Sequence, residues 1–126
     1  MIRRPTPVAV ALAAAVLVWL GHSGDASGHA LVIESLPRPD EPVPPSFSRI
    51  VLRFNSRIEK SLSRVSILGP NADRVRLRVT GDGGPGSLIA PVPTLSPGIY
   101  TLEWKVLSTD GHVTEGGFRF RVMPAP

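Results

Sequence analysis

The segment from residue 98 to residue 122 constrains the fold more than any other part of the chain, because two alternating runs flank one short polar connection. Apolar side chains take every second position of both runs: Tyr100, Leu102, Trp104 and Val106 before the connection, and Phe118, Phe120 and Val122 after it. A period of two is the pattern of strands that bury one face. The segment therefore predicts two strands joined by a polar turn.

The connection between the two runs holds Asp110 and His112, two side chains that commonly bind metals, with one glycine between them. Asp-Gly is also a frequent hairpin turn signal, and a histidine beside it is often only a solvated loop residue. If residues 110–112 are extended, both side chains point to the same side, as joint metal binding requires. If Asp110 and Gly111 form a tight turn, joint binding requires a bulge. The sequence leaves both conformations open.

The remainder of the chain favours a compact all-β module. It has 126 residues, 42% of them hydrophobic, with 14 Pro and 12 Gly and no convincing long helix. Short strands are expected at residues 29–35, 50–54, 65–67, 74–80, 88–90, 100–106 and 118–122. Residues 43–46 read as an irregular proline loop and residues 55–62 as a turn or a single helical turn. We therefore predict a seven-stranded antiparallel Greek-key β-sandwich of the immunoglobulin-like kind.

The predicted core is the set of apolar residues that alternate within these strands. It consists of Val32, Ile50, Leu52, Phe54, Val65, Ile67, Val75, Leu77, Tyr100, Leu102, Trp104, Val106, Phe118 and Phe120. Trp104 is its largest member, and core packing is the role we expect for it.

The first 28 residues have the three-part pattern of a secretory signal peptide. Arg3 and Arg4 form a basic start, Val8 to Leu20 is an apolar run, and residues 21–28 are small and polar. The apolar run is short for a membrane span, although an uncleaved anchor is the alternative. We expect residues 1–28 to be a signal peptide, which places the protein in the periplasm or outside the cell, and residues 29–126 to be one domain.

The cleavage position decides which residue begins the exported protein. Cleavage after Gly28 leaves His29 first, whereas cleavage after Ala30 leaves Leu31 first. Cleavage after Gly28 is the expectation, and His22 is then discarded with the signal peptide.

Charge and cysteine content exclude several classes of function. The formal net charge is +4, but the arginines at 74, 76 and 78 alternate with apolar residues like the outer face of a strand, and no nucleic-acid partner is expected. There is no cysteine, which excludes disulfides and thiolate metal sites. Ser108 and Thr109 have no histidine base in any hydrolase motif, so no catalytic nucleophile is expected.

A histidine at the start of the exported chain would be a chelating group. Its α-amine, with a reference pKa of about 7.7–8.0, and its own ring nitrogen can bind one metal ion at neutral pH. The His112 imidazole and the Asp110 carboxylate would complete a set of nitrogen and oxygen donors that suits Cu(II). The predicted metal ligands are therefore His29, Asp110 and His112, with one Cu(II) per chain.

The chain resembles the CopC-type family of periplasmic copper-binding proteins. The resemblance rests on a signal peptide ending just before a histidine, the strand HALVIESLPRPDE, the segment LRFNSRIE and the strand-loop pair GIYTLEWKVLSTDGHVTEGGFRFRV, and it covers nearly all of residues 29–123. It implies a cupredoxin-like sandwich that binds Cu(II) through His29, Asp110 and His112. It further implies a monomer acting in copper homeostasis or resistance, with a membrane copper transporter as a candidate partner.

Two positions depart from the pattern of this family. Some relatives have a site for Cu(I) rich in methionine and histidine, but here Met123 is the only methionine after the signal peptide and there is no third histidine, so we expect no Cu(I) site. Some relatives also have an acidic residue near the copper soon after the LRF segment, where this chain has Asn55 and Ser56.

Two other classes of function remain open on the sequence alone. The same amine and two imidazoles form the ligand set of copper monooxygenases that cleave polysaccharides. The small size, the lack of an aromatic platform for a glycan and the presence of Asp110 oppose that reading. A metal-free adhesive or structural sandwich is the third possibility. The leading expectation is a protein that sequesters Cu(II) or delivers it to a partner, without catalysis.

Overall fold

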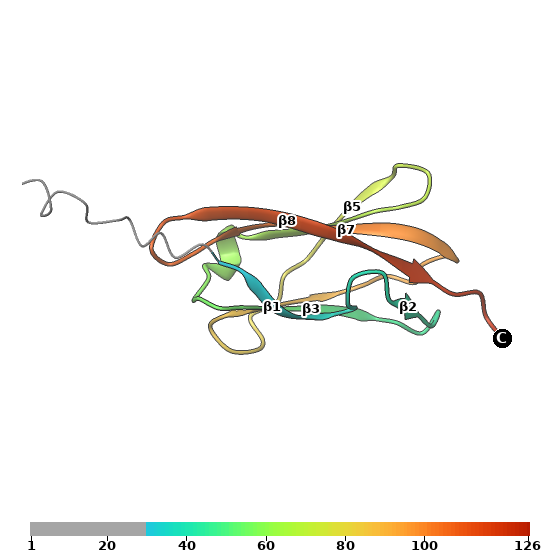
Figure 1. Cartoon of the computed structure of the whole chain (residues 1–126), viewed down its shortest axis with the longest axis horizontal. Helices are drawn as coiled ribbons and strands as arrows, with labels where there is room; N and C mark the ends of the chain where they lie inside the picture. The colour runs from blue at the N-terminus through green and yellow to red at the C-terminus, as the bar shows by residue number, and fades with distance from the viewer. Residues whose placement is uncertain (1–29) are drawn as a thin grey trace, which may run out of the picture.

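The computed structural model describes residues 30–126, which form two β-sheets packed face to face (Figure 1). The smaller sheet has the order β1-β3-β6, with β1 at Val32–Leu36, β3 at Arg49–Phe54 and β6 at Ser87–Pro91. The larger sheet has the order β2-β8-β7-β4-β5, with β2 at Pro42–Val43, β8 at Val113–Val122, β7 at Gly98–Leu107, β4 at Arg64–Leu68 and β5 at Arg74–Leu77. His29 and the predicted signal peptide lie outside the described residues.

The long hairpin of β7 and β8 dominates the larger sheet. Its antiparallel register runs without a break from the pair Gly98 and Val122 to the pair Leu107 and Val113. The alternating runs of the sequence therefore form the predicted pair of strands. The second strand begins at Val113, five residues before the expected start, because residues 113–117 pair with β7 although their side chains do not alternate in polarity.

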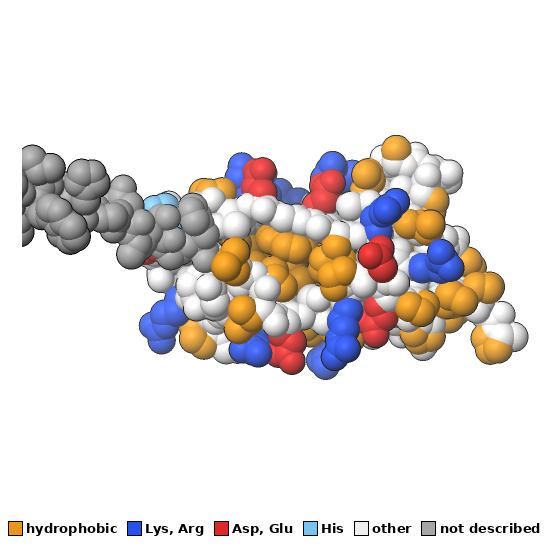
Figure 2. All heavy atoms as spheres, viewed as in Figure 1, with side chains coloured by type: hydrophobic (Ala, Val, Ile, Leu, Met, Phe, Trp, Pro, Cys, Tyr) orange, Lys and Arg blue, Asp and Glu red, His pale blue; other side chains and the backbone are white. Residues whose placement is uncertain are grey.

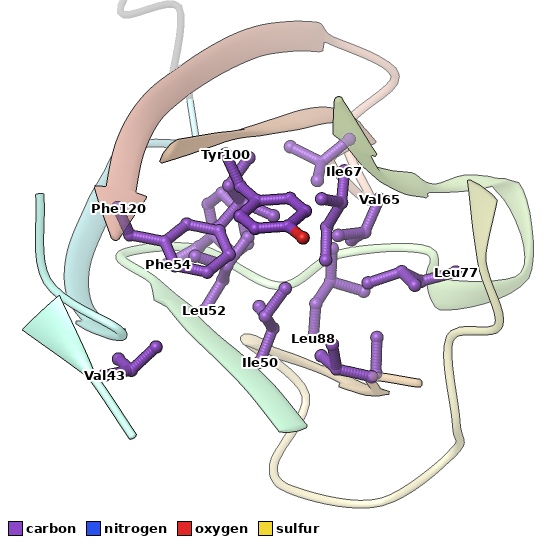
Figure 3. Packing of buried hydrophobic residues seen from close by; sticks show 14 of the residues in the cluster. Val43, Ile50, Leu52, Phe54, Val65, Ile67, Leu77, Leu88, Tyr100 and Phe120 are labelled. Atoms are coloured by element: carbon purple, nitrogen blue, oxygen red, sulfur yellow. The ribbon is translucent and has the colours of Figure 1, made fainter. Parts of the chain in front are cut away.

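The core lies between the two sheets and contains most of the predicted residues (Figure 3). The Tyr100 and Phe120 rings stack there with centroids 5.8 Å apart. Buried members of the predicted set are Ile50, Leu52, Phe54, Val65, Ile67, Leu77, Tyr100, Leu102, Val106 and Phe120. Val32, Trp104 and Phe118 are only partly buried and pack against the edge of this core.

The prediction for Val75 was wrong, since its side chain is 44% exposed. It pairs with buried Ile67, but β5 is the last strand of the larger sheet, and the three strands of the smaller sheet leave Val75 uncovered. The expected strand at 74–80 is also shorter, because β5 ends at Leu77.

The strand count and the purely antiparallel arrangement also need correction. Residues 30–126 contain eight strands, one more than predicted, and the addition is β2 in the expected proline loop. β2 pairs with the end of β8 in parallel, held by the Met123 N–H, which donates to the Val43 carbonyl at 2.9 Å.

The expected turn at residues 55–62 contains a single 3-10 turn, η1, at Lys60–Leu62. Over residues 30–126, no helix has the length and apolar character needed to cross a membrane.

Candidate metal site

The turn between β7 and β8 is tight, which decides between the two conformations that the sequence left open. The Ser108 N–H donates to the His112 carbonyl at 2.8 Å, and the Gly111 N–H donates to the Ser108 carbonyl at 2.9 Å. Gly111 has a φ of 92°, a conformation that glycine adopts without steric cost. A turn followed by a glycine with positive φ is the usual form of a three-residue hairpin loop with a bulge.

This turn brings the side chains of Asp110 and His112 together. The His112 Nδ1 lies 3.1 Å from Asp110 Oδ2, and the His112 backbone N–H donates to Asp110 Oδ1 at 3.2 Å. About half of each side chain is exposed to solvent. Of the two conformations that the sequence left open, it is therefore the bulged turn that brings these side chains together.

The contact with His112 changes the acidity of Asp110. The hydrogen bonds from the His112 side chain and backbone hold the pKa of the Asp110 carboxyl below its ordinary value. The carboxylate is therefore ionised at neutral pH and provides a negative charge beside the imidazole. The His112 ring is oriented with Nδ1 toward Asp110 and Nε2 away from that carboxylate.

The segment 55–59 connects this turn to the start of β1. Leu31 and Asn55 exchange two hydrogen bonds, from the Leu31 N–H to Asn55 Oδ1 at 2.8 Å and from the Asn55 N–H to the Leu31 carbonyl at 3.0 Å. A few residues later, Ile58 forms a β-bridge with Ser108, and the Thr109 N–H donates to the Arg57 carbonyl at 3.1 Å. The start of β1 and the turn between β7 and β8 are thus fixed to one segment.

The same segment places the first described residues at the end of the sandwich that carries the turn (Figure 1). Ala30 is 1% exposed and belongs to the core, so the backbone at this point is held firmly. His29, the third predicted ligand, precedes Ala30 in the sequence and lies outside the described residues.

Three buried hydroxyl groups lie on the segments that build this end of the molecule. The Ser56 Oγ, Ser108 Oγ and Thr114 Oγ1 atoms make no hydrogen bond with any residue that the structure describes. Buried hydroxyls in proteins normally have a partner, such as another chain segment, water or a ligand. This end of the sandwich therefore has hydroxyl groups whose hydrogen bonds are not satisfied within residues 30–126.

The described residues alone do not complete a metal site. No group of three or more histidine, cysteine, aspartate or glutamate side chains within residues 30–126 is arranged to hold a metal ion. Asp110 and His112 supply two donors, so a third donor of these residue types would come from outside this range. The anchoring role of Asn55 has no signal in the sequence, since no local pattern links residues 24 positions apart.

Comparison with known proteins gives consistent results. A family model of the CopC domain matches residues 32–123. Protein YobA of Escherichia coli (strain K12) is 31% identical over 97 residues, which cover 75% of this chain and 78% of that protein. The copper transport protein CutJ of Bacillus subtilis (strain 168) is 23% identical over 97 residues, which cover 75% of this chain but only 18% of that larger protein.

Solved structures show the same fold. The crystal structure of CopC from Methylosinus trichosporium OB3b is similar with a TM-score of 0.73 and 31% identity, covering 78% of this chain and 97% of that one. PcoC from Escherichia coli, described as a methionine-rich copper resistance protein, has a TM-score of 0.60 at 24% identity, covering 75% of this chain and 98% of that one. At 24% identity, the similarity to PcoC shows only that the two chains share a fold.

Proposed function

This chain belongs to the CopC domain family, and we propose that it is an exported protein that binds one Cu(II) ion and either sequesters it or passes it to a partner. The observation that carries the proposal is the convergence of Asp110 and His112 at the turn of the β7–β8 hairpin, 3.1 Å apart. The name of the Bacillus relative, a copper transport protein, supports copper as the cargo. A membrane copper transporter would be a suitable partner for a protein located in the periplasm or outside the cell.

The proposed donors are the α-amine and imidazole of His29, the imidazole of His112 and the carboxylate of Asp110. Nitrogen donors with one carboxylate oxygen suit Cu(II), which favours tetragonal arrangements of such ligands. The anchoring of Leu31 to Asn55 supports the inclusion of His29, because it fixes the chain two residues away. A histidine further along a mobile terminus would lose more conformational entropy on binding.

Asp110 is suited to two tasks in such a site. The Asp110 carboxylate accepts hydrogen bonds from the His112 backbone and side chain, and this holds the imidazole beside it at the turn. Each carboxylate oxygen also has a second lone pair. We propose that Asp110 holds His112 at the turn in the metal-free protein, and that its carboxylate contributes an oxygen to Cu(II) when the ion takes the place of this hydrogen bond.

The decisive experiment compares two proteins that differ only at the terminus. One begins at His29, and the other has a single alanine before His29, which converts the α-amine into a peptide nitrogen. We expect one Cu(II) per chain in the first protein, with an electron paramagnetic resonance spectrum typical of nitrogen and oxygen ligands. Its visible absorption spectrum should lack the intense blue band of a copper thiolate. The extended protein should bind Cu(II) much more weakly. Equal affinity in both proteins would remove the terminal amine from the site.

The absence of catalysis is a separate part of the proposal. The copper-loaded protein should not produce peroxide faster than free Cu(II) in the presence of a reductant, and it should not cleave polysaccharides. Sustained turnover in either assay would favour an oxygenase instead.

A further inference from the structure

One side of the sandwich is open between β1 and β8. A cleft of about 650 Å³ lies there, and its apolar floor includes the partly buried side chains of Val32, Trp104 and Phe118. The Trp104 and Phe118 rings meet edge to face, with centroids 5.8 Å apart. Figure 2 shows an apolar patch in the middle of this side, in the gap between β8 and β1 of the matching view in Figure 1.

The edge of β8 beside this cleft has unpaired backbone groups. At its far end, the Arg119 carbonyl accepts from the Asp40 N–H at 2.6 Å and the Arg121 N–H donates to the Glu41 carbonyl at 3.1 Å. Because successive residues of a strand point their backbone groups to opposite edges, Val113, Glu115 and Gly117 face the same edge as Arg119. No described residue pairs with the strand there. We call residues 113–117 the free edge of β8.

Two glycines of this edge stand where a side chain would not fit. A Cβ atom on Gly116 would lie 2.4 Å from the Trp104 ring, and a Cβ atom on Gly117 would lie 2.7 Å from the Leu102 carbonyl oxygen. Glycine within a strand weakens it, and often marks a place where another backbone approaches closely. Glu115 is the one charged residue of the free edge, which has no lysine or proline of the kind that commonly protects exposed strand edges.

We propose that the free edge of β8 binds an extended segment of a different protein, which adds a strand to the five-stranded sheet. Residues of this segment opposite Thr114 and Gly116 would lie on the same face of the sheet as Trp104 and Phe118, so apolar side chains there would extend the apolar cover of these rings toward the turn. The residue opposite Glu115 would lie on the outer face. The Glu115 side chain is 69% exposed, and its ion pair with Lys105, at 3.3 Å, lies on the side of β7. A basic residue on the open side of Glu115 would therefore complement its charge as well.

A second copy of this chain does not fit the same edge. Two copies related by a two-fold axis must pair antiparallel, and pairing centred on Glu115 sets two carboxylates directly opposite each other, which is unfavourable. Pairing shifted toward Arg119 brings the second strand against Asp40 and Glu41, which already occupy that part of the edge. The charge and the position of β2 therefore select a different partner strand.

The inference does not rest on copper binding, although the two sites adjoin. Val113, the first residue of the free edge, follows His112 directly in the sequence. A strand bound there would end beside the turn between β7 and β8, so a partner could approach the cargo while it is held by backbone hydrogen bonds. Testing with metal-free protein separates this inference from the proposed function.

The probe is a seven-residue peptide of alternating lysine and valine, blocked at both ends and added to the metal-free protein. We expect saturable shifts in the amide signals of Val113, Glu115 and Gly117 in two-dimensional nuclear magnetic resonance spectra, and a peptide with glutamate in place of lysine should bind more weakly. Absence of shifts along this edge would overturn the proposal. Concentration-dependent shifts of these signals without peptide would identify a second copy as the occupant and would also overturn it.

Two matched pairs test the role of the backbone. Glu115→Pro removes an N–H that faces the free edge, whereas Glu115→Thr removes the same charge and keeps the N–H. We expect the proline variant to bind the lysine-valine peptide about 2- to 12-fold more weakly than the threonine variant, which is the cost of one lost hydrogen bond. On the peptide side, N-methylation of the residues that face β8 should abolish binding, whereas N-methylation of the alternate residues should not. This second pair needs no change in the protein, and equal binding within either pair would contradict strand addition.

Discussion

The hydrogen bond from the Leu31 N–H to Asn55 Oδ1 should contribute to copper affinity rather than to the stability of the metal-free protein. Asn55→Ala removes this 2.8 Å bond but keeps the second one, from the Asn55 N–H to the Leu31 carbonyl. The bond is exposed, so in the metal-free variant water can satisfy the Leu31 N–H, and the free energy of unfolding should change by less than about 1 kcal/mol. If His29 is a ligand, however, the start of β1 must be ordered for the metal to bind.

The expected size of the effect on copper follows from the energy of one such bond. A net contribution of about 0.5–1.5 kcal/mol corresponds to a loss of about 2- to 12-fold in Cu(II) affinity. Competition titration with a chelator of known affinity measures this loss, and urea unfolding of the metal-free variant measures the stability. Asn55→Asp is the matched control, because it keeps an acceptor oxygen for Leu31 and should retain at least the wild-type affinity.

The same substitution in the protein with an alanine before His29 provides the refuting comparison. In that protein the terminal amine cannot bind copper, so Asn55→Ala should have almost no further effect. If Asn55→Ala lowers affinity equally in both proteins, or in neither, then the anchor does not act through the terminus and the reasoning is wrong.

Three further predictions concern the hairpin. Gly116→Ala should destabilise the protein by about 1–3 kcal/mol in urea unfolding, because its Cβ atom would meet the Trp104 ring at 2.4 Å, whereas Gly84→Ala, with open space around it, should be nearly neutral; equal stability would contradict this. Asp110→Ala should lower Cu(II) affinity by about 10- to 100-fold in chelator competition, and a large fall in the melting temperature of the metal-free variant would instead assign the residue to turn formation. The folded-state pKa of Asp110 is depressed, so the contact with His112 stabilises the fold above about pH 3.9 and is lost as the pH falls through the lowered value. A carboxyl titration by nuclear magnetic resonance should show that His112→Ala raises the pKa of Asp110. An unchanged pKa would exclude the side-chain hydrogen bond of His112 as the cause of the depression.

Alternation in the sequence predicted which residues share a face, but not what covers that face. Ile67 and Val75 pair with each other, and both have the expected period, yet only Ile67 is buried. The difference arises because β5 lies beyond the cover of the smaller sheet, which is a property of the tertiary arrangement. β2 was missed for a related reason, since two residues cannot display a period.

The candidate site was predictable to a similar extent. Residue chemistry and spacing singled out Asp110 and His112, and the structure brings them together. The conformation of the turn depends on the hydrogen bonds of Ser108 and on the positive φ of Gly111, which Asp-Gly permits but does not require. The roles of His29 as a ligand and of copper as the cargo stay predictions.

The segment 55–59 joins the two sheets at one end of the sandwich. It follows β3 of the smaller sheet, holds Leu31 at the start of β1, and bridges to Ser108 and Thr109 in the hairpin of the larger sheet. Any opening of the sandwich at this end would separate the two parts of the proposed site. A metal ion that needs both parts binds only the closed sandwich. By thermodynamic linkage, the free energy by which closure strengthens metal binding equals the free energy by which the bound metal stabilises the closed state. Hydrogen exchange at Thr109 should therefore slow on loading with Cu(II), so that occupancy of the site can be read from how often the sandwich opens.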